Sequence, residues 1–100
     1  MQNLIQEAPE VAQAFRQLTQ SIDGYSPLDL KTKELILIGI FTADKAVRGI
    51  DTHVRIALEA GAKKDEIISA ILYAMPIVGL PSVTLALGKA LEIIDQHQTG

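Results

Sequence analysis

The stretch from Glu34 to Phe41, ELILIGIF, decides between an all-helical fold and one that contains a sheet. Its apolar residues point in nearly every direction around a helix, which is typical of a central, buried element. An isoleucine-rich run of this length is also compatible with a buried strand. Lys31 and Lys33 lead into the run without a turn signal between them and the apolar residues. We therefore expect a helix here.

Turn and cap signals divide the rest of the chain into further helices. Ser26, with Pro27 next to it, or alternatively Asp29, is expected to cap the central helix. Gly61 is expected to end the helix that follows. No strand is expected, so the fold class is all-α, with about five helices in a single domain over residues 1–100. The expected helices cover approximately Pro9–Ile22, Ser26–Phe41, Ala46–Ala60, Lys63–Pro76 and Pro81–Asp95.

The composition predicts a protein that associates with copies of itself. The chain has 100 residues, of which 48% are hydrophobic and only 4% aromatic. A domain of this size has a limited core, and the surplus apolar surface favours a homo-oligomer. The net charge of −3 and the scattered basic residues do not favour a nucleic-acid partner. The chain has no cysteine, which excludes disulfides, thiolate metal sites and thiol redox chemistry carried by its own residues.

One uncharged segment, from Ile67 to Gly88, is long enough to cross a bilayer. Pro76, Gly79 and Pro81 interrupt it, so two buried helices that meet at a tight turn are the better interpretation. The N-terminal sequence MQNLIQEAPE lacks the basic region and apolar core of a secretory signal. We expect a cytoplasmic protein without a membrane partner.

The candidate chemistry centres on His53. At helical spacing its neighbours are apolar and mostly small, among them Ala46 and Gly49. A partly buried imidazole needs partners for its ring nitrogens. Glu34 also faces an apolar stripe, and an unpaired buried carboxylate is costly. If their helices pack together, Glu34 and His53 form either an acid–base unit or a structural pair that pins two helices. No ligand spacing for a metal accompanies them.

Three stretches resemble the carboxymuconolactone decarboxylase family, which includes the alkylhydroperoxidase-D-like proteins. They are LDLKTKELI (Leu28 to Ile36), HVRIALEAGAKKDEI (His53 to Ile67) and YAMPIVGLP (Tyr73 to Pro81), and the resemblance extends over about 26–91. It implies an all-helical fold that assembles as dimers, trimers or hexamers, with sites near subunit contacts.

The redox branch of that family carries a Cys-x-x-Cys pair, a histidine and an upstream relay glutamate. The resemblance places the glutamate on Glu34 and the histidine on His53, while the two cysteine positions fall on Ala46 and Gly49. A thiol peroxidase cycle needs an attacking thiolate and a second, resolving thiol. Alkylhydroperoxidase or peroxiredoxin-type activity is therefore not expected of this chain.

The lactone decarboxylase branch needs no cysteine, and the resemblance implies acid–base chemistry on a small carboxylic acid or lactone without metal or cofactor. His53 would move the proton, and Arg48 or Lys45 would hold the carboxylate. Arg48 lies about 140° around the helix from His53 and would have to reach toward it. The expected substrate pocket is floored by Ala46 and Gly49.

Either Tyr73 or Met75, both in the YAMPIVGLP stretch, is expected as a wall of this pocket. Arg55 is expected to take part in a structural salt bridge. The alternative function is a non-catalytic oligomeric binding or structural protein of the same fold, in which Glu34 and His53 only join two helices.

Overall fold

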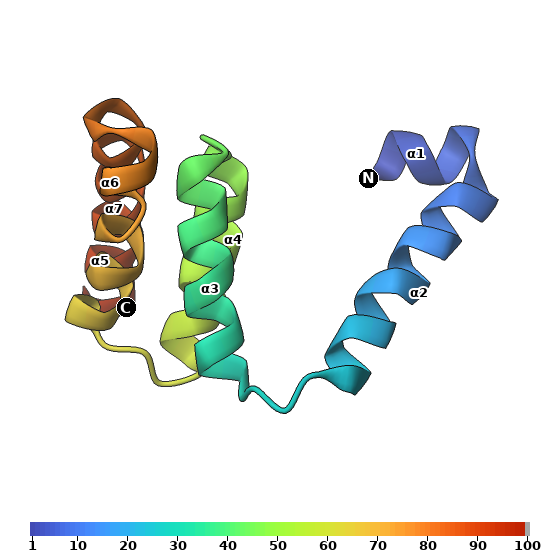
Figure 1. Ribbon diagram of the computed structural model, residues 1–100, viewed down its shortest axis with the longest axis horizontal. Helices are drawn as coiled ribbons and strands as arrows, with labels where there is room; N and C mark the ends of the chain where they lie inside the picture. The colour runs from blue at the N-terminus through green and yellow to red at the C-terminus, as the bar shows by residue number, and fades with distance from the viewer. Residues whose placement is uncertain (100) are drawn as a thin grey trace.

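The computed structural model describes residues 1–99, and in this part of the chain every regular element is an α-helix (Figure 1). The all-α prediction is confirmed, including the choice of helix over strand for the Glu34–Phe41 run. The helices are α1 (Gln2–Glu7), α2 (Pro9–Tyr25), α3 (Leu30–Ala43), α4 (Val47–Glu59), α5 (Lys64–Leu72), α6 (Met75–Val78) and α7 (Leu80–Thr99).

The core lies between α3, α4, α5 and α7. α3 packs against the other three, as its apolar circumference predicts, and α4 and α5 also pack against α7. Each helix contributes side chains that are fully buried, such as Ile38, Val54, Ile67 and Val83. Burial of each such side chain contributes about 1.5–3 kcal/mol, so this cluster holds the four helices in place.

Local capping explains where α3 begins. Asp29 is its N-cap, and its Oδ1 accepts a hydrogen bond from the Thr32 backbone N–H at 2.8 Å. A hydrogen bond from the Thr32 side chain first, and then this backbone bond, hold the pKa of Asp29 below its usual value of 3.8. Ser26 instead accepts a hydrogen bond from the Leu28 N–H within the preceding linker. Of the two predicted caps, Asp29 is therefore the one used.

The helix boundaries differ from the predicted ones at several points. Two short helices, α1 and α6, were not expected, so the described residues form seven helices rather than about five. Pro76 lies in the first turn of α6 instead of ending the preceding helix, a position where the missing N–H costs nothing. Gly24 stays inside α2, which continues to Tyr25. Gly61 does follow the end of α4, with a φ of 93° that favours glycine.

The N-terminal arm, α1 and α2, stands apart from the other helices (Figure 1). Each of these two helices has the other as its only extensive helix neighbour among the described residues. Ala12 is the one buried residue that α2 contributes. None of the helices in residues 1–99 combines the length and hydropathy that a membrane span requires.

Gly88 gives a stability prediction. It is exposed in α7, and a Cβ at this position would meet no atom within 4 Å. We expect Gly88→Ala to raise the free energy of unfolding by about 0.5–1 kcal/mol, because alanine loses less backbone entropy than glycine on forming a helix. Urea unfolding followed by circular dichroism measures this. A decrease in stability would show that α7 needs the glycine for a contact with another molecule.

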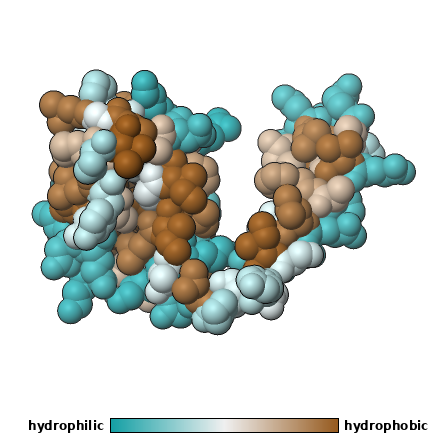
Figure 2. Space-filling model, viewed as in Figure 1, coloured by the Kyte–Doolittle hydropathy of each residue, from teal (hydrophilic) through white to brown (hydrophobic). Residues whose placement is uncertain are grey.

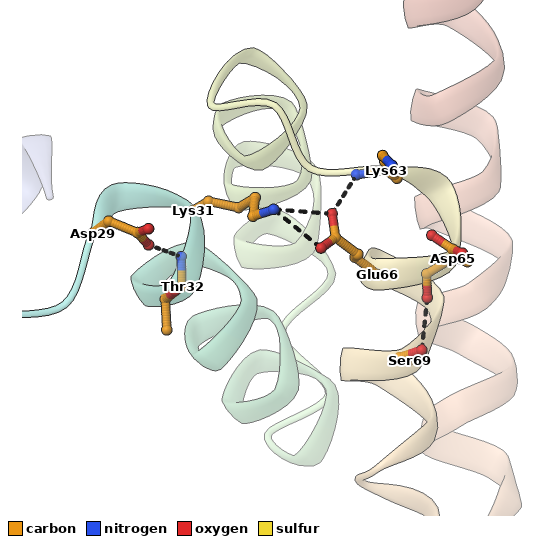
Figure 3. Close-up of polar contacts among 7 residues, drawn as sticks. All are labelled: Asp29, Lys31, Thr32, Lys63, Asp65, Glu66 and Ser69. Carbon is orange, nitrogen blue, oxygen red and sulfur yellow. Dashed lines mark hydrogen bonds and ion pairs between the residues drawn. The ribbon is translucent and has the colours of Figure 1, made fainter.

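An ion pair between α3 and α5 gives a pH prediction (Figure 3). The Lys63 N–H donates to Glu66 at 2.9 Å, and Lys31 Nζ lies 3.1 Å from the same carboxylate. The Lys63 bond first, and then Lys31, hold the pKa of Glu66 below its usual value of 4.5. The ionised form therefore stabilises the fold above this usual value, and the contribution is lost as the pH falls through the lowered pKa.

We expect the melting temperature to fall on acidification below about pH 5, and to fall less steeply in Glu66→Gln than in the natural chain. Calorimetric melting between about pH 7 and pH 3 measures both slopes. Glu59→Gln is the matched control, because Glu59 is exposed and makes no ion pair within residues 1–99. Equal slopes in Glu66→Gln and the natural chain would contradict the prediction.

Candidate functional site

Glu34 is a carboxylate on the buried side of α3. It precedes Ile38 by one helical turn, so both side chains lie on the face that packs against the neighbouring helices. Glu34 is only 2% exposed, while Ile38 is completely buried. A carboxylate in this position requires a polar partner, because burial without one costs several kcal/mol, on the order of 2–7 for a polar group.

His53 of α4 is that partner. Its Nδ1 lies 2.5 Å from Glu34 Oε1, and the two side chains are 23% and 2% exposed. The spacing argument expected these residues to meet if their two helices packed together, and the packing of α3 on α4 does bring them together. Because a carboxylate oxygen accepts, Nδ1 carries the proton and its N–H donates a hydrogen bond to Glu34 Oε1. The other ring nitrogen, Nε2, is then the one available to a bound molecule.

The Phe41 ring packs against one face of the His53 imidazole. The two rings stack with their centroids 5.0 Å apart and an interplanar angle of 22°. Phe41 belongs to α3, as Glu34 does, so one helix both hydrogen-bonds and packs against His53. The sequence did not indicate this role, because Phe41 reads as one more apolar residue of the central run. The Phe41 ring also lies close to Gly49, and this contact explains why position 49 needs a residue without a side chain.

Gly49 lies directly beneath the Phe41 ring. A Cβ at position 49 would fall 2.5 Å from Phe41 Cγ and 2.7 Å from Cε1, well inside van der Waals contact. The space that the small residue leaves is therefore filled by the aromatic ring. Ala46 is the N-cap of α4 and is partly buried. It follows Lys45, whose backbone is left-handed with a φ of 58°.

The remaining predicted site residues make no hydrogen bond or ring contact with the Glu34–His53 pair in the described part of the chain. Arg48 is exposed on α4 and makes no hydrogen bond or ion pair with the described residues. Tyr73 is 82% exposed and lines a separate groove between α3 and α5, with none of the other predicted site residues. Met75 packs against the hydrophobic core. The structure thus separates Tyr73 from the histidine with which the sequence grouped it.

Arg55 takes part in a polar network that joins α4 to α7. Its Nε donates to Asp51 at 2.7 Å within α4, and its Nη2 lies 3.5 Å from Gln96 of α7. Lys89 of α7 is 3.3 Å from the other oxygen of Asp51. These bonds, first that of Arg55 and then that of Lys89, lower the pKa of Asp51 below its usual value of 3.8. The network joins α4 to α7 on the side away from the catalytic candidates.

In the described part of the chain, no three histidine or carboxylate side chains lie close enough together to hold a metal ion. What the site offers is one imidazole held by one buried carboxylate. Such a unit can take up and release a proton at a fixed position.

Comparison with known proteins agrees with this arrangement of helices. The model of the carboxymuconolactone decarboxylase family matches residues 9–92. A solved structure with a similar fold is the apo crystal structure of a carboxymuconolactone decarboxylase family protein from Legionella pneumophila. It is 29% identical, with a TM-score of 0.79, over 94% of this chain and 83% of that one. No protein of curated function matches the chain.

Proposed function

This chain belongs to the carboxymuconolactone decarboxylase family, and we propose that it is a cytoplasmic enzyme that performs cofactor-free acid–base chemistry on a small carboxylic acid or lactone. In this proposal His53 is the catalytic residue and Glu34 is its positioning residue. The observation that carries it is the Nδ1–Oε1 hydrogen bond of 2.5 Å between a half-buried histidine and a fully buried carboxylate.

The pair suits proton transfer for two reasons. The Glu34 carboxylate holds Nδ1 in one tautomer and stabilises the positive charge that arises when Nε2 takes up a proton. Phe41 prevents rotation of the ring by stacking on its face. The imidazole is therefore ready to deliver a proton without first reorganising, which is where general acid–base catalysis gains its effect of about 10²–10⁴-fold.

Decarboxylation of a carboxylated lactone would proceed in two balanced steps. The bond between the ring carbon and the carboxylate breaks, CO₂ leaves, and the electron pair moves into the conjugated system that ends at the lactone carbonyl. The protonated His53 then gives its Nε2 proton to the carbon skeleton, and the ring regains a proton from water. No oxidant or reductant is needed, in agreement with a chain that contains no cysteine.

The substrate would approach Nε2 on the exposed side of α4. In this arrangement Ala46 and Gly49 keep the first turn of α4 narrow, and Arg48, exposed on the same turn, holds the carboxylate. Lys45 is exposed beside them and carries the same charge. Tyr73 is a substrate contact only if the ligand reaches across from the separate groove between α3 and α5.

The test compares two histidine variants with the natural chain. Carboxymuconolactone and a set of small carboxylated γ-lactones serve as substrates, and release of CO₂ is the readout. We expect His53→Gln to lower turnover by about 10²–10⁴-fold in a protein that remains folded at the assay temperature, although Glu34 loses its imidazole partner. His97→Gln is the matched control, because His97 is exposed near the end of α7, and it should retain full turnover.

The structural alternative predicts the opposite pattern. If the natural chain consumes none of these compounds, and His53→Gln chiefly lowers the melting temperature, the Glu34–His53 pair only joins two helices. Turnover of an alkyl hydroperoxide by the pure chain would contradict the proposal in another way, because it would require redox chemistry without a thiol.

A further inference from the structure

We infer that Lys45, at the turn between α3 and α4, is a specificity-determining residue that binds the carboxylate of the substrate together with Arg48. This inference rests on the proposed function, because it concerns the same site. Its basis is the backbone of the turn, which keeps a lysine in a conformation that glycine adopts more readily.

Lys45 has a backbone conformation that is unusual for a residue with a side chain. Its φ is 58°, and every other positive φ among residues 1–99 belongs to a glycine, either Gly61 or Gly79. A Cβ atom is disfavoured in this left-handed region. Such strain is found preferentially at active sites and ligand-binding turns, where the side chain has a role that outweighs the loss of stability.

Two backbone hydrogen bonds hold the turn in this conformation. The Lys45 N–H donates to the Thr42 carbonyl at 3.2 Å, and the Ala46 N–H donates to the Phe41 carbonyl at 3.0 Å. These bonds form the Schellman arrangement at the end of a helix, whose left-handed position is usually a glycine. Because the Phe41 ring also stacks on His53, one residue connects the turn of Lys45 to the imidazole of the proposed site.

The cations of this turn have no partner in the described part of the chain. Lys45 and Arg48 are exposed and make no hydrogen bond or ion pair there, not even with the exposed carboxylate of Asp44. The lysines that join other helices are paired with carboxylates, namely Lys31, Lys33 and Lys89. Figure 2 shows hydrophilic side chains at the end of the molecule where α3 meets α4. Two unpaired positive charges three residues apart attract an anion.

The dipole of α3 does not explain why the lysine stands at position 45. A cation near the end of a helix is attracted to the last carbonyl groups, and salt screens this attraction at an exposed position. A lysine one or two residues earlier would give the same attraction without a positive φ. The position of the charge on the left-handed residue therefore calls for a second reason, and binding of an anion supplies it.

The distance between the turn and the imidazole suits a small acid. Ala46 and His53 are seven residues apart, so they share one face of α4 and are separated by about 10 Å along its axis. Lys45 precedes Ala46 and carries its charge on a flexible four-carbon stem. With the substrate carboxylate bound at the turn, the carbon that receives the proton lies toward Nε2 of His53.

The first experiment measures the strain. We expect Lys45→Gly to raise the melting temperature by about 2–8 °C, because glycine adopts the positive φ without a Cβ contact. Asp44→Gly is the matched control at the neighbouring position. Asp44 has an ordinary φ of −83°, so glycine there should lower the melting temperature. A melting temperature that falls in Lys45→Gly would overturn the inference, because the lysine would then stabilise the turn.

The second experiment measures binding of paraconate, a saturated γ-lactone that carries one carboxylate. Shifts of the Ala46 and Gly49 amide signals in an NMR titration report its affinity. We expect Lys45→Met to weaken binding by at least about tenfold, and Lys45→Arg to restore it. Lys64→Met is the matched control, because Lys64 is exposed at the start of α5 without an ion pair in residues 1–99. It should bind paraconate as the natural chain does.

The outcomes separate this inference from the proposed function. An unchanged affinity in Lys45→Met would overturn the inference, and so would a natural chain that does not bind paraconate. Binding that depends on Lys45 in a chain without turnover would support the inference and contradict the proposed chemistry. If the chain does turn over a carboxylated lactone, Lys45→Met should raise KM by at least about tenfold with little change in kcat.

Discussion

Replacing Glu34 by alanine is expected to lower the free energy of unfolding by about 3–4 kcal/mol. The side chain is 2% exposed and lies in a closely packed region between α3 and α4. Its removal leaves a cavity and also leaves the Nδ1–H of His53 without an acceptor. Removing one member of a buried charged pair costs about 3–5 kcal/mol, and the partial exposure of His53 places the effect toward the lower end. Urea unfolding at one fixed protein concentration measures it.

Glu34→Gln is the control that separates shape from charge. The glutamine carbonyl can accept the same hydrogen bond from Nδ1, so we expect a loss of only about 1 kcal/mol. The variant pair Glu34→Ala and His53→Ala, combined in a double-mutant cycle, should give a coupling energy of about 1.5–3 kcal/mol. Additive effects of the two alanine substitutions would show that the hydrogen bond contributes nothing to the stability of the fold.

The same glutamine variant bears on the proposed function. An amide cannot stabilise the imidazolium by charge, although it preserves the geometry of the hydrogen bond. If His53 transfers protons, Glu34→Gln should slow turnover while the protein remains folded. If the pair only joins two helices, Glu34→Gln should cause only the loss of about 1 kcal/mol in stability and no change in any turnover. Stability and turnover together therefore distinguish a positioning residue from a structural one.

Helical periodicity predicted the Glu34–His53 contact on the condition that their two helices pack together, because each side chain needed a polar partner. Each polar group lay on a face meant for the core, and each could satisfy the other. The role of Phe41 could not be predicted in this way. An aromatic residue in an apolar run carries no signal of which neighbour it touches, and the stacking on His53 depends on how α3 and α4 pack.

The composition predicted surplus apolar surface but not its position. The stripe on α2 has the same periodicity as the buried faces of α4 and α7, so the pattern alone suggests one core. Only the structure shows that α2 stands apart and that Ile36 and Ile40 of α3 remain exposed. The short helices α1 and α6 were missed because six and four residues are too few to establish a helical period.

Gly49→Ala is expected to lower the free energy of unfolding by about 1–3 kcal/mol, which is opposite in sign to the effect of Gly88→Ala. Both glycines lie inside helices, where alanine normally adds about 0.5–1 kcal/mol of stability. At position 49, however, the new methyl group would overlap the Phe41 ring. The ring must move, and its stacking on His53 moves with it. Urea unfolding of both alanine variants, under the same conditions, measures the contrast.

A second background shows whether Phe41 is the cause. In a Phe41→Leu chain the ring is absent, so Gly49→Ala should there become neutral or stabilising by up to about 1 kcal/mol. An unchanged loss of stability in this background would mean that the overlap lies elsewhere.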